Sequence, residues 1–285
     1  MKLVFDIGGT RLRRGVLDDR GEFVLLDDRI NAGDLESTLE ALIDEALAKY
    51  PIDFVGVSVA AQTFQNRILS APNINLGALK GVDFAARMRT RFSLNAAIDN
   101  DLKCAAIAEV AARADVSSLF ALFIGTGIGG AYAENGKLIR GANNNAGEIG
   151  HMPFEKTPFL CGCGGAECLE TSASGSAIAK WSEYYGLKER KLSDLINSDN
   201  PKATEIADRF YRGVDRAIKT IAALFNPRVI ALGGGLALAE KSVLSCANEA
   251  LKNAFAPAAD IAIELSSLGD KANLLGASFL DLQPK

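Results

Sequence analysis

Short apolar runs that end in glycine predict strands in both halves of the chain. Residues 2–7 precede Gly8-Gly9, and residues 119–124 precede Gly125-Thr126-Gly127. A run of this length bounded by glycine is typical of a strand followed by a tight turn. The same reasoning predicts a hairpin and further strands, which cover residues 12–18, 22–30, 54–59, 95–98, 128–133 and 229–232.

Apolar residues spaced three and four apart predict the helices. Asp34 begins one such pattern, and Asn200-Pro201 begins a longer one that must end before Asn226-Pro227, because Asn and Asp cap helices and Pro fits the first turn. The order strand, glycine turn, hairpin, helix, strand occurs twice, which predicts an α/β fold with mixed sheets and flanking helices in two lobes. Further helices are predicted at residues 101–114, 238–255 and 273–282.

The length of 285 residues fits about two domains. We expect an N-terminal α/β lobe over residues 1–115, with the C-terminal helix at 273–285 packing back on it. A larger α/β lobe would cover residues 116–272. The composition, 48% hydrophobic and 23% charged, is that of a folded globular chain.

Charge and hydropathy argue against two classes of partner. The net charge of −4 and the pI near 5.3 do not fit a nucleic-acid binder, which usually carries a basic patch. The apolar start of the chain is too short for a signal peptide, and no window approaches the 18 apolar residues of a membrane span. We therefore expect a cytoplasmic protein without a nucleic-acid or membrane partner.

Three of the five cysteines crowd into eight residues. Cys161, Cys163 and Cys168 follow His151, the chain's one histidine, and glycines separate the thiols. One His and three Cys suit a closed, tetrahedral, structural zinc site, whereas a catalytic zinc needs an open position. The second ring nitrogen of His151 could face a ligand. The alternative is a set of unrelated buried thiols.

Glycine turns follow three predicted strands, at Gly8-Gly9, Gly125–Gly130 and Gly233–Gly235. Glycine lets backbone N–H groups approach phosphate oxygens, and the Thr10 and Thr126 hydroxyls would add donors. Ordinary tight turns are the alternative for each segment taken singly. Rossmann and Walker patterns are absent. Asp6 lies at the end of the first strand, where it could hold Mg²⁺ through water.

Acidic residues at two places are candidates for acid–base chemistry or sugar binding. Asp99-Asn100-Asp101 precedes a helix, so an Asp there either caps that helix or takes a proton from a substrate hydroxyl. Phosphoryl transfer needs little beyond such a base, positioning and charge neutralisation. Glu148 and Glu170 bracket the predicted zinc loop, where they are either solvated or hydrogen-bonded to sugar hydroxyls.

Together these motifs resemble the ROK family of repressors and sugar kinases, within the actin-like ATPase superfamily. The resemblance runs from Asp6 to about Gly276. It rests on D-I-G-G-T, N-D, G-T-G-I-G-G, N-G-K-L-I-R-G-A, G-E-I-G-H, C-G-C-G-G-A-E-C-L-E and the late G-G-G. It implies a two-lobed actin-like (ribonuclease H-like) fold that closes over its substrate, and often a dimer, with the dimerisation surface expected in the larger lobe.

The resemblance also implies a role for individual residues. Asp101 would be the catalytic base, Asp6 would serve Mg²⁺, and zinc would be bound by His151, Cys161, Cys163 and Cys168. The remaining sugar contacts would be Asn73, Asn100, Glu148, His151 and Glu170. The residues that hold ATP would be Asp6, Gly8, Gly9, Thr10, Arg11, Thr126, Gly127, Gly234 and Gly235.

Two departures from the family pattern bear on the substrate. Ala60-Ala61 stands where family kinases usually carry Pro-Gly, and this loop is expected beside the sugar. Arg11 stands where Lys is common and keeps the charge. We expect an ATP-dependent kinase of glucokinase type acting at O6 of glucose or a close relative. N-acetylmannosamine, N-acetylglucosamine, fructose and allose remain open as substrates.

Two non-kinase functions are the alternatives. A sugar-responsive repressor would carry an N-terminal helix-turn-helix, for which no room is expected before Asp6. A sensor without catalysis would not need every catalytic position that this chain keeps.

Overall fold

This computed structural model describes residues 1–285 except 19, 31–33, 72–73, 255–259 and 284–285. The chain forms two compact units. Unit 1 comprises Met1–Ala112, Ala142–Asn144 and Asp270–Lys285, and unit 2 comprises Arg113–Gly141 and Asn145–Gly269. The lobe boundary near residue 115 that the sequence indicates stays a prediction.

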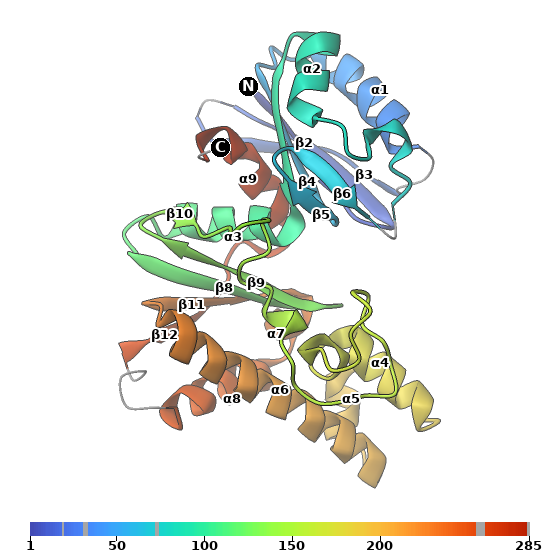
Figure 1. The fold of residues 1–285 in the computed structure, drawn as a ribbon, viewed down its shortest axis with the longest axis vertical. Helices are drawn as coiled ribbons and strands as arrows, with labels where there is room; N and C mark the ends of the chain where they lie inside the picture. Colours follow the sequence, from blue (N-terminus) through green and yellow to red (C-terminus); the bar gives the residue numbers. More distant parts are fainter. Residues whose placement is uncertain (19, 31–33, 72–73, 255–259, 284–285) are drawn as a thin grey trace. The chain divides into compact units, whose positions relative to one another are not determined.

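The sheet of unit 1 has five strands in the order β3-β2-β1-β4-β7 (Figure 1). Strands β1, β4 and β7 are parallel, while β2 pairs antiparallel with both β1 and β3. Every residue of β4 is buried, as expected for a strand covered on both faces. The bounds are β1 Lys2–Ile7, β2 Arg11–Leu17, β3 Phe23–Ile30, β4 Phe54–Val59 and β7 Asn95–Asn100, with a small hairpin of β5 Gln62–Phe64 and β6 Arg67–Ser70.

Helices cover both faces of this sheet: α1 and α2 lie on one face and α9 on the other (Figure 1). Helix α1 begins where predicted, since the Asp34 carboxylate accepts a hydrogen bond from the Ser37 N–H. A Cβ on Gly56 would lie 2.1 Å from the carbonyl oxygen of Ala277, so glycine is what lets α9 lie against β4. The bounds are α1 Leu35–Leu47, α2 Phe84–Phe92, α3 Asp101–Ala112 and α9 Ala272–Ser278, with 3₁₀ turns η1 Gly77–Leu79, η5 Gly269–Lys271 and η6 Leu280–Leu282.

The sheet of unit 2 repeats this arrangement in the order β10-β9-β8-β11-β12 (Figure 1). Strands β8, β11 and β12 are parallel, and β9 pairs antiparallel with β8 and β10. The predicted α/β class with mixed sheets is thus confirmed. The bounds are β8 Ser118–Ile124, β9 Ile128–Glu134, β10 Lys137–Leu138, β11 Val229–Gly233 and β12 Ala262–Leu265.

The long helix α6 carries much of the core of unit 2. It begins at Pro201 after the Asn200 cap and ends at Phe225, and the C-cap Asn226 takes the left-handed conformation with φ 41°. Both ends agree with the sequence prediction. Apolar residues of α6 such as Phe210 and Val214 are fully buried. The bounds are α4 Gly175–Tyr184, α5 Leu192–Ile196, α6 Pro201–Phe225, α7 Gly235–Ala239 and α8 Lys241–Lys252, with 3₁₀ turns η2 Ile149–His151 and η3 Leu169–Thr171.

Two predicted helices are shorter than expected. The pattern over 238–255 belongs to α7 and α8, because Glu240 is extended at φ −112° and ψ 98°; its last residue lies outside the described residues. The pattern over 273–282 is divided between α9 and η6 at Phe279. Several short elements were not predicted: β5, β6, β10, β12, α2, α4 and α5.

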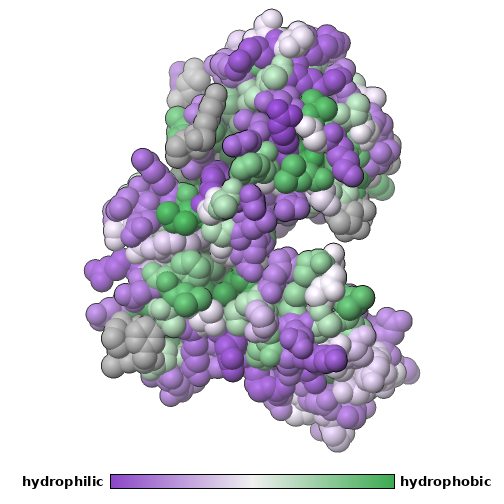
Figure 2. Space-filling view, in the orientation of Figure 1, coloured by the Kyte–Doolittle hydropathy of each residue, from purple (hydrophilic) through white to green (hydrophobic). Residues whose placement is uncertain are grey.

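Hydrophilic residues are interspersed with apolar ones over the visible surface of each unit (Figure 2). Large apolar side chains that are exposed include Ile30 and Leu224. Among the described residues, none of the helices combines the length and the apolar character that crossing a bilayer requires.

Candidate functional site

The predicted residues of unit 1 gather where its parallel strands end. The strand register places Asp6 of β1 opposite Ser58 of β4, and Ser58 opposite Asp99 of β7. In open α/β sheets this carboxyl edge is where ligands bind. The predicted segments Gly8–Arg11 and Asn100-Asp101 follow β1 and β7, and the Ala60-Ala61 loop follows β4 between them in the sheet order.

The carboxylate of Asp6 is buried and accepts hydrogen bonds on both oxygens. Oδ2 accepts from Arg13 Nε at 3.1 Å, and Oδ1 accepts from Asn273 Nδ2 at 3.0 Å and Ser58 Oγ at 3.2 Å. Direct coordination of a cation would displace these donors, whereas the predicted contact with Mg²⁺ through water would leave them in place. Sequence reasoning did not find Arg13, Ser58 or Asn273, and Asn273 is 267 residues away from Asp6.

The turn after β1 is closed by a hydrogen bond from Gly8 N to Arg11 O of 2.8 Å. Gly9 lies within this turn, and Thr10 and Arg11 are exposed beside it. Arg11 donates to Asp28, and this hydrogen bond raises the pKa of the guanidinium. The predicted sugar contact Asn73 lies outside the described residues.

The three residues Asp99, Asn100 and Asp101 differ in their contacts and in their exposure. Asn100 caps α3, since its Oδ1 accepts from Leu102 N at 3.0 Å and from Lys103 N at 3.2 Å. Asp99 is only 4% exposed, whereas Asp101 is half-buried at the first position of α3. Of the two carboxylates, Asp101 is therefore the one that a substrate hydroxyl could reach. Asn100 thus fills the capping position, and Asp101 Oδ1 also accepts from Leu102 N at 2.9 Å, so the alternative that an Asp binds the start of this helix stays open.

In unit 2 the glycine turns converge in the same way at the ends of β8 and β11. A Cβ on Gly125 would lie 3.6 Å from Gly235 N, so the two backbones are adjacent. Gly234 has φ 90°, and a Cβ there would lie 2.5 Å from Ile124 O, so only glycine fits. The first residues of α4 fix the turn: Gly175 N donates to Gly125 O at 2.8 Å, and Ser176 N donates to Thr126 O at 2.9 Å.

Glu170 links this glycine turn to the cysteine segment. Its Oε2 accepts from Ile128 N at 3.2 Å and lies 2.5 Å from where a Cβ on Gly127 would be. Its Oε1 lies 3.5 Å from Cys161 Sγ. A predicted sugar contact, a predicted phosphate contact and a predicted metal ligand are thus neighbours within unit 2.

His151, Cys161, Cys163 and Cys168 form a group whose ligand atoms all lie within 4.8 Å of one another. Cys161 Sγ is 3.6 Å from His151 Nδ1, and Cys163 Sγ is 3.4 Å from Cys168 Sγ. A tetrahedral ion with bonds of about 2.3 Å separates its ligands by about 3.7 Å. The four residues therefore fit one metal ion with little rearrangement.

The thiols of this group differ in acidity. Burial raises the pKa of Cys161 to about 12 and also raises the pKa of Cys168. A backbone N–H donated by Gly165 lowers the pKa of Cys163. A Cβ on Gly165 would lie 2.9 Å from Cys168 Sγ, so glycine keeps room beside the sulfurs. Binding of a cation would replace the protons on the buried thiols.

His151 and Glu148 lie at the two ends of one short turn. The main-chain carbonyl of Glu148 accepts from His151 N at 3.1 Å, which closes η2. His151 is exposed and Glu148 is half-buried. The imidazole thus turns Nδ1 toward Cys161 while its ring remains accessible to a ligand.

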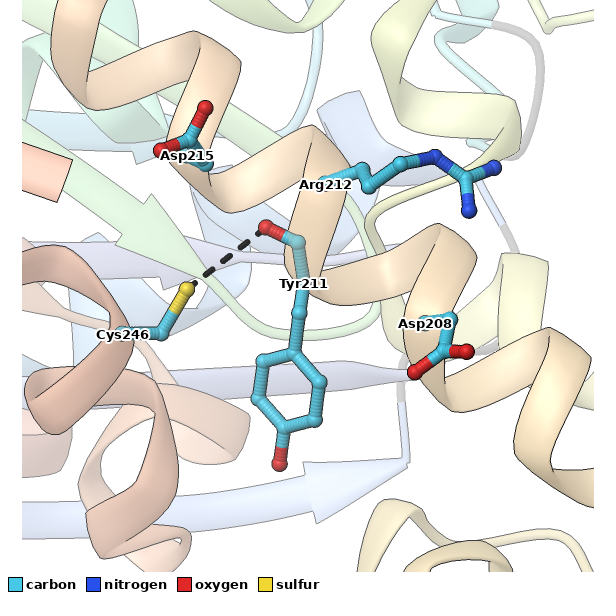
Figure 3. Close-up of a pocket in the computed structure, with 5 residues that line it drawn as sticks. All are labelled: Asp208, Tyr211, Arg212, Asp215 and Cys246. Carbon is cyan, nitrogen blue, oxygen red and sulfur yellow. Dashed lines mark hydrogen bonds between the residues drawn. The ribbon is translucent and has the colours of Figure 1, made fainter. Parts of the chain in front are cut away.

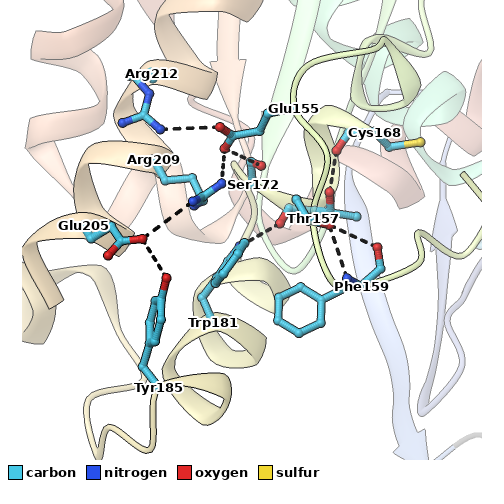
Figure 4. Close-up of polar contacts among 11 residues, drawn as sticks. Glu155, Thr157, Phe159, Cys168, Ser172, Trp181, Tyr185, Glu205, Arg209 and Arg212 are labelled. Carbon is cyan, nitrogen blue, oxygen red and sulfur yellow. Dashed lines mark hydrogen bonds and ion pairs between the residues drawn. The ribbon is translucent and has the colours of Figure 1, made fainter. Parts of the chain in front are cut away.

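Side chains of α4 and α6 support the segment that carries Glu170 (Figure 4). Trp181 Nε1 donates to Thr171 O at 3.1 Å, and Ser172 Oγ donates to Glu155 Oε1 at 3.0 Å. The same oxygen of Glu155 accepts from Arg209 at 2.5 Å, and the Arg209 guanidinium lies 4.1 Å from the Trp181 ring centre. Sequence reasoning missed this support, because no local pattern links residues 155, 172 and 209.

A separate pocket of about 410 Å³ lies between α6 and α8 of unit 2 (Figure 3). Cys246 on α8 points toward α6, and its Sγ lies 3.5 Å from Tyr211 O. Burial raises the pKa of this thiol to about 11. None of the predicted site residues lines it. The lining residues are Asp208, Tyr211, Arg212, Asp215 and Cys246.

The ROK family model matches residues 3–283, so the chain belongs to the ROK family. N-acetyl-D-glucosamine kinase of Vibrio vulnificus (strain YJ016) is 29% identical over 300 residues, 98% of this chain and 98% of that protein. N-acetylmannosamine kinase of Yersinia pseudotuberculosis is 29% identical over 246 residues, 83% of each chain.

Among solved structures, a ROK hexokinase from Thermus thermophilus matches with a TM-score of 0.80 and 27% identity over 98% of both chains. The fold is accordingly that of the actin-like ATPases, as the sequence predicts.

Proposed function

We propose that this protein is a sugar kinase that uses ATP to phosphorylate a hydroxyl of an N-acetylhexosamine or a hexose. The observation that carries the proposal is the position of Asp101, an accessible carboxylate at the start of α3 and at the carboxyl edge of β1, β4 and β7. Proton removal from a sugar hydroxyl requires a carboxylate within hydrogen-bond reach of that hydroxyl.

The proposed reaction divides into proton removal and phosphoryl transfer. Asp101 would accept the proton of the hydroxyl as its oxygen bonds to the γ-phosphorus, while the bond to the bridging oxygen breaks and ADP leaves. Backbone N–H groups of the glycine turns would donate hydrogen bonds to phosphate oxygens. Mg²⁺, placed near Asp6 through water, would neutralise the charge that builds up on the phosphates.

In unit 2, Glu148, His151 and Glu170 would accept or donate hydrogen bonds to sugar hydroxyls. Zinc held by His151, Cys161, Cys163 and Cys168 would fix the chain around them, a structural role for an ion with four protein ligands. Support for this comes from the 3.5 Å approach of Cys161 Sγ to Glu170 Oε1, which ties a metal ligand to a sugar contact.

The identity of the sugar is part of the proposal. N-acetylglucosamine and N-acetylmannosamine are favoured because kinases named for them are similar to this chain over 98% and 83% of its length. Glucose, the substrate expected from sequence, is the second candidate, with fructose after it. Location in the cytoplasm and assembly as a homodimer remain predictions.

A panel of sugars tests this function. Purified protein with ATP and Mg²⁺ should release ADP only when a substrate sugar is present, in a coupled assay over N-acetylglucosamine, N-acetylmannosamine, glucose, fructose and allose. We expect an N-acetylhexosamine to give the largest kcat/KM. If no sugar stimulates ADP release, the proposed function is wrong; if glucose alone does, the substrate order reverses.

A further inference from the structure

Thr63, Asp99 and Asn144 form a buried hydrogen-bonded cluster directly behind the Asn100-Asp101 pair. Thr63 Oγ1 donates to Asp99 Oδ1 at 2.9 Å, and Asn144 Nδ2 lies 2.8 Å from the same oxygen. All three side chains are buried, with Thr63 2%, Asp99 4% and Asn144 7% exposed. Asp99 belongs to the Asp99-Asn100-Asp101 segment described above, whereas Thr63 and Asn144 have no role in the sites described so far.

This cluster also receives the backbone of Asn100. The Asn100 N–H lies 2.8 Å from Asp99 Oδ1 and 3.0 Å from Thr63 Oγ1. One carboxylate oxygen therefore faces three donors, from Thr63, Asn100 and Asn144. A buried carboxylate is costly unless donors compensate it, so the cluster has a strong preference for this one geometry.

Asn144 belongs to a three-residue segment that joins unit 1 between two stretches of unit 2. Residues 142–144 belong to unit 1, although the chain on either side of them belongs to unit 2. Asn144 takes the left-handed conformation with φ 63°, which Asn adopts more readily than most residues. Its amide lies 3.2 Å from Thr63 Oγ1 and 3.3 Å from Thr63 O as well as near Asp99.

We propose that Thr63 and Asn144 are positioning residues for the kinase reaction, which hold the Asn100-Asp101 backbone through Asp99. The inference rests on the proposed function, since it assigns Asp101 the role of base. The side chain of Asn100 is fixed separately, by the N-terminus of α3 and by Ala61 O at 3.1 Å. The cluster therefore acts on the backbone at the strand-to-helix junction, one residue before Asp101.

The predicted consequence is a loss of kcat with little change in sugar affinity. A base displaced by about 1 Å can cost up to about 100-fold in rate while the binding contacts survive. Thr63→Val keeps the shape but removes both the donor to Asp99 and the acceptor for Asn100 N. We expect it to lower kcat at least about tenfold and to change the sugar Kd less than about threefold.

A conservative variant and a second site make the test specific. Thr63→Ser keeps the hydroxyl and should retain at least about half of the parent kcat. Asn144→Gly removes the amide at a position where φ 63° suits glycine, and should lower kcat about threefold or more. Asn135→Gly is its matched control: Asn135 also has positive φ, 50°, but is exposed in the turn before Gly136.

The measurements are kcat and KM by coupled assay, sugar Kd by calorimetry, and the melting temperature of each variant. The assay temperature is set well below every melting point, so that lost activity does not reflect unfolded protein. If the parent is active and the folded Thr63→Val and Asn144→Gly variants keep its kcat, the positioning role is wrong while the proposed function stands. The positioning role is also wrong if kcat falls as far in Thr63→Ser as in Thr63→Val, or as far in Asn135→Gly as in Asn144→Gly. An inactive parent would overturn the proposed function and this inference with it.

Discussion

At the residue scale, the carboxylates of Asp99 and Asp101 lie two residues apart but in different environments. Asp99 points into the protein, where three donors face one of its oxygens. Asp101, two residues later, is half-buried at the start of α3. Because the chain turns from strand to helix between them, the two side chains are not interchangeable as a general base.

Replacement of Asp101 by Asn should separate binding from catalysis. The amide keeps the size of the side chain but cannot accept a proton, so kcat should fall by about 100-fold or more while sugar Kd stays within about threefold. Steady-state kinetics and calorimetry on the same preparation check both values. Asp115→Asn, which removes the same charge from an exposed position, should leave kcat unchanged.

Near-normal turnover in the Asp101→Asn variant would assign the base to another residue. A large loss of sugar affinity instead would mean that Asp101 binds the sugar rather than activates it.

The sequence could predict the residues whose partners lie close along the chain. His151 and the three cysteines fall within 18 residues, so their spacing alone indicated a shared metal. Thr63 and Asn144 could not be found this way, because they meet Asp99 from 36 and 45 positions away. Only the sheet and the chain's excursion into unit 1 bring them together.

At the element scale, the long helix α6 was predictable from its apolar spacing and its caps, whereas the short helices α2, α4 and α5 were not. Helix α6 carries 25 residues with a clear cap at each end. Helix α2 has nine residues, three of them Arg, and buries only Phe84 and Met88, so no apolar face stands out in its sequence. The hairpin of β5 and β6 has strands of three and four residues, too short to show a period.

Glu155 is the residue through which α6 supports the Glu170 segment, and its removal should affect both stability and sugar binding. Glu155→Ala leaves the Arg209 charge, 14% exposed, without its main carboxylate. We expect unfolding free energy to fall by about 2 kcal/mol, since breaking a largely buried ion pair leaves an uncompensated charge. Sugar KM should rise, because Ser172, two residues after Glu170, loses its hydrogen-bond partner.

Urea denaturation and steady-state kinetics measure these two effects. Glu249→Ala is the matched control, because its ion pair with Lys252 is exposed, 64% and 73%, and such pairs contribute about 0–1 kcal/mol. Equal destabilisation in both variants would mean that the Glu155 contacts carry no special weight.

At the scale of the whole molecule, each unit repeats one plan and presents its glycine turns at the carboxyl edge of its sheet. In unit 1 that edge holds Asp6 and the Asn100-Asp101 pair, and in unit 2 it holds the Gly125–Gly127 turn and Gly234. The repeated order of strands explains why the sequence predicted the fold class well. The metal group is an addition to unit 2 that the repeated plan does not require.

Removal of the metal should therefore weaken sugar binding before it unfolds unit 2. Core residues such as Phe210 and Ile230 are buried independently of the metal group, whereas Glu170 lies 3.5 Å from Cys161 Sγ. After chelation we expect sugar Kd to rise about tenfold or more while far-ultraviolet circular dichroism is largely kept. Unchanged sugar affinity in metal-free protein would contradict the scaffold role of the ion.

The pH dependence of metal binding follows from the raised pKa values of Cys161, about 12, and Cys168. In the metal-free protein both thiols are protonated near neutral pH, and the ion must displace those protons. Metal affinity should therefore rise with pH, by about tenfold per pH unit for each proton released, between about pH 6 and 8.

Competition against a chelator of known affinity at each pH measures the slope. Cys161 and Cys168, whose pKa values are raised by burial, should contribute to the slope across this range, and Cys163, whose pKa is lowered by the Gly165 N–H, should contribute less at its upper end. A metal affinity that does not change with pH would mean that the cysteines are not the ligands. Protein treated with a thiol-blocking reagent is the control, and it should no longer bind the metal.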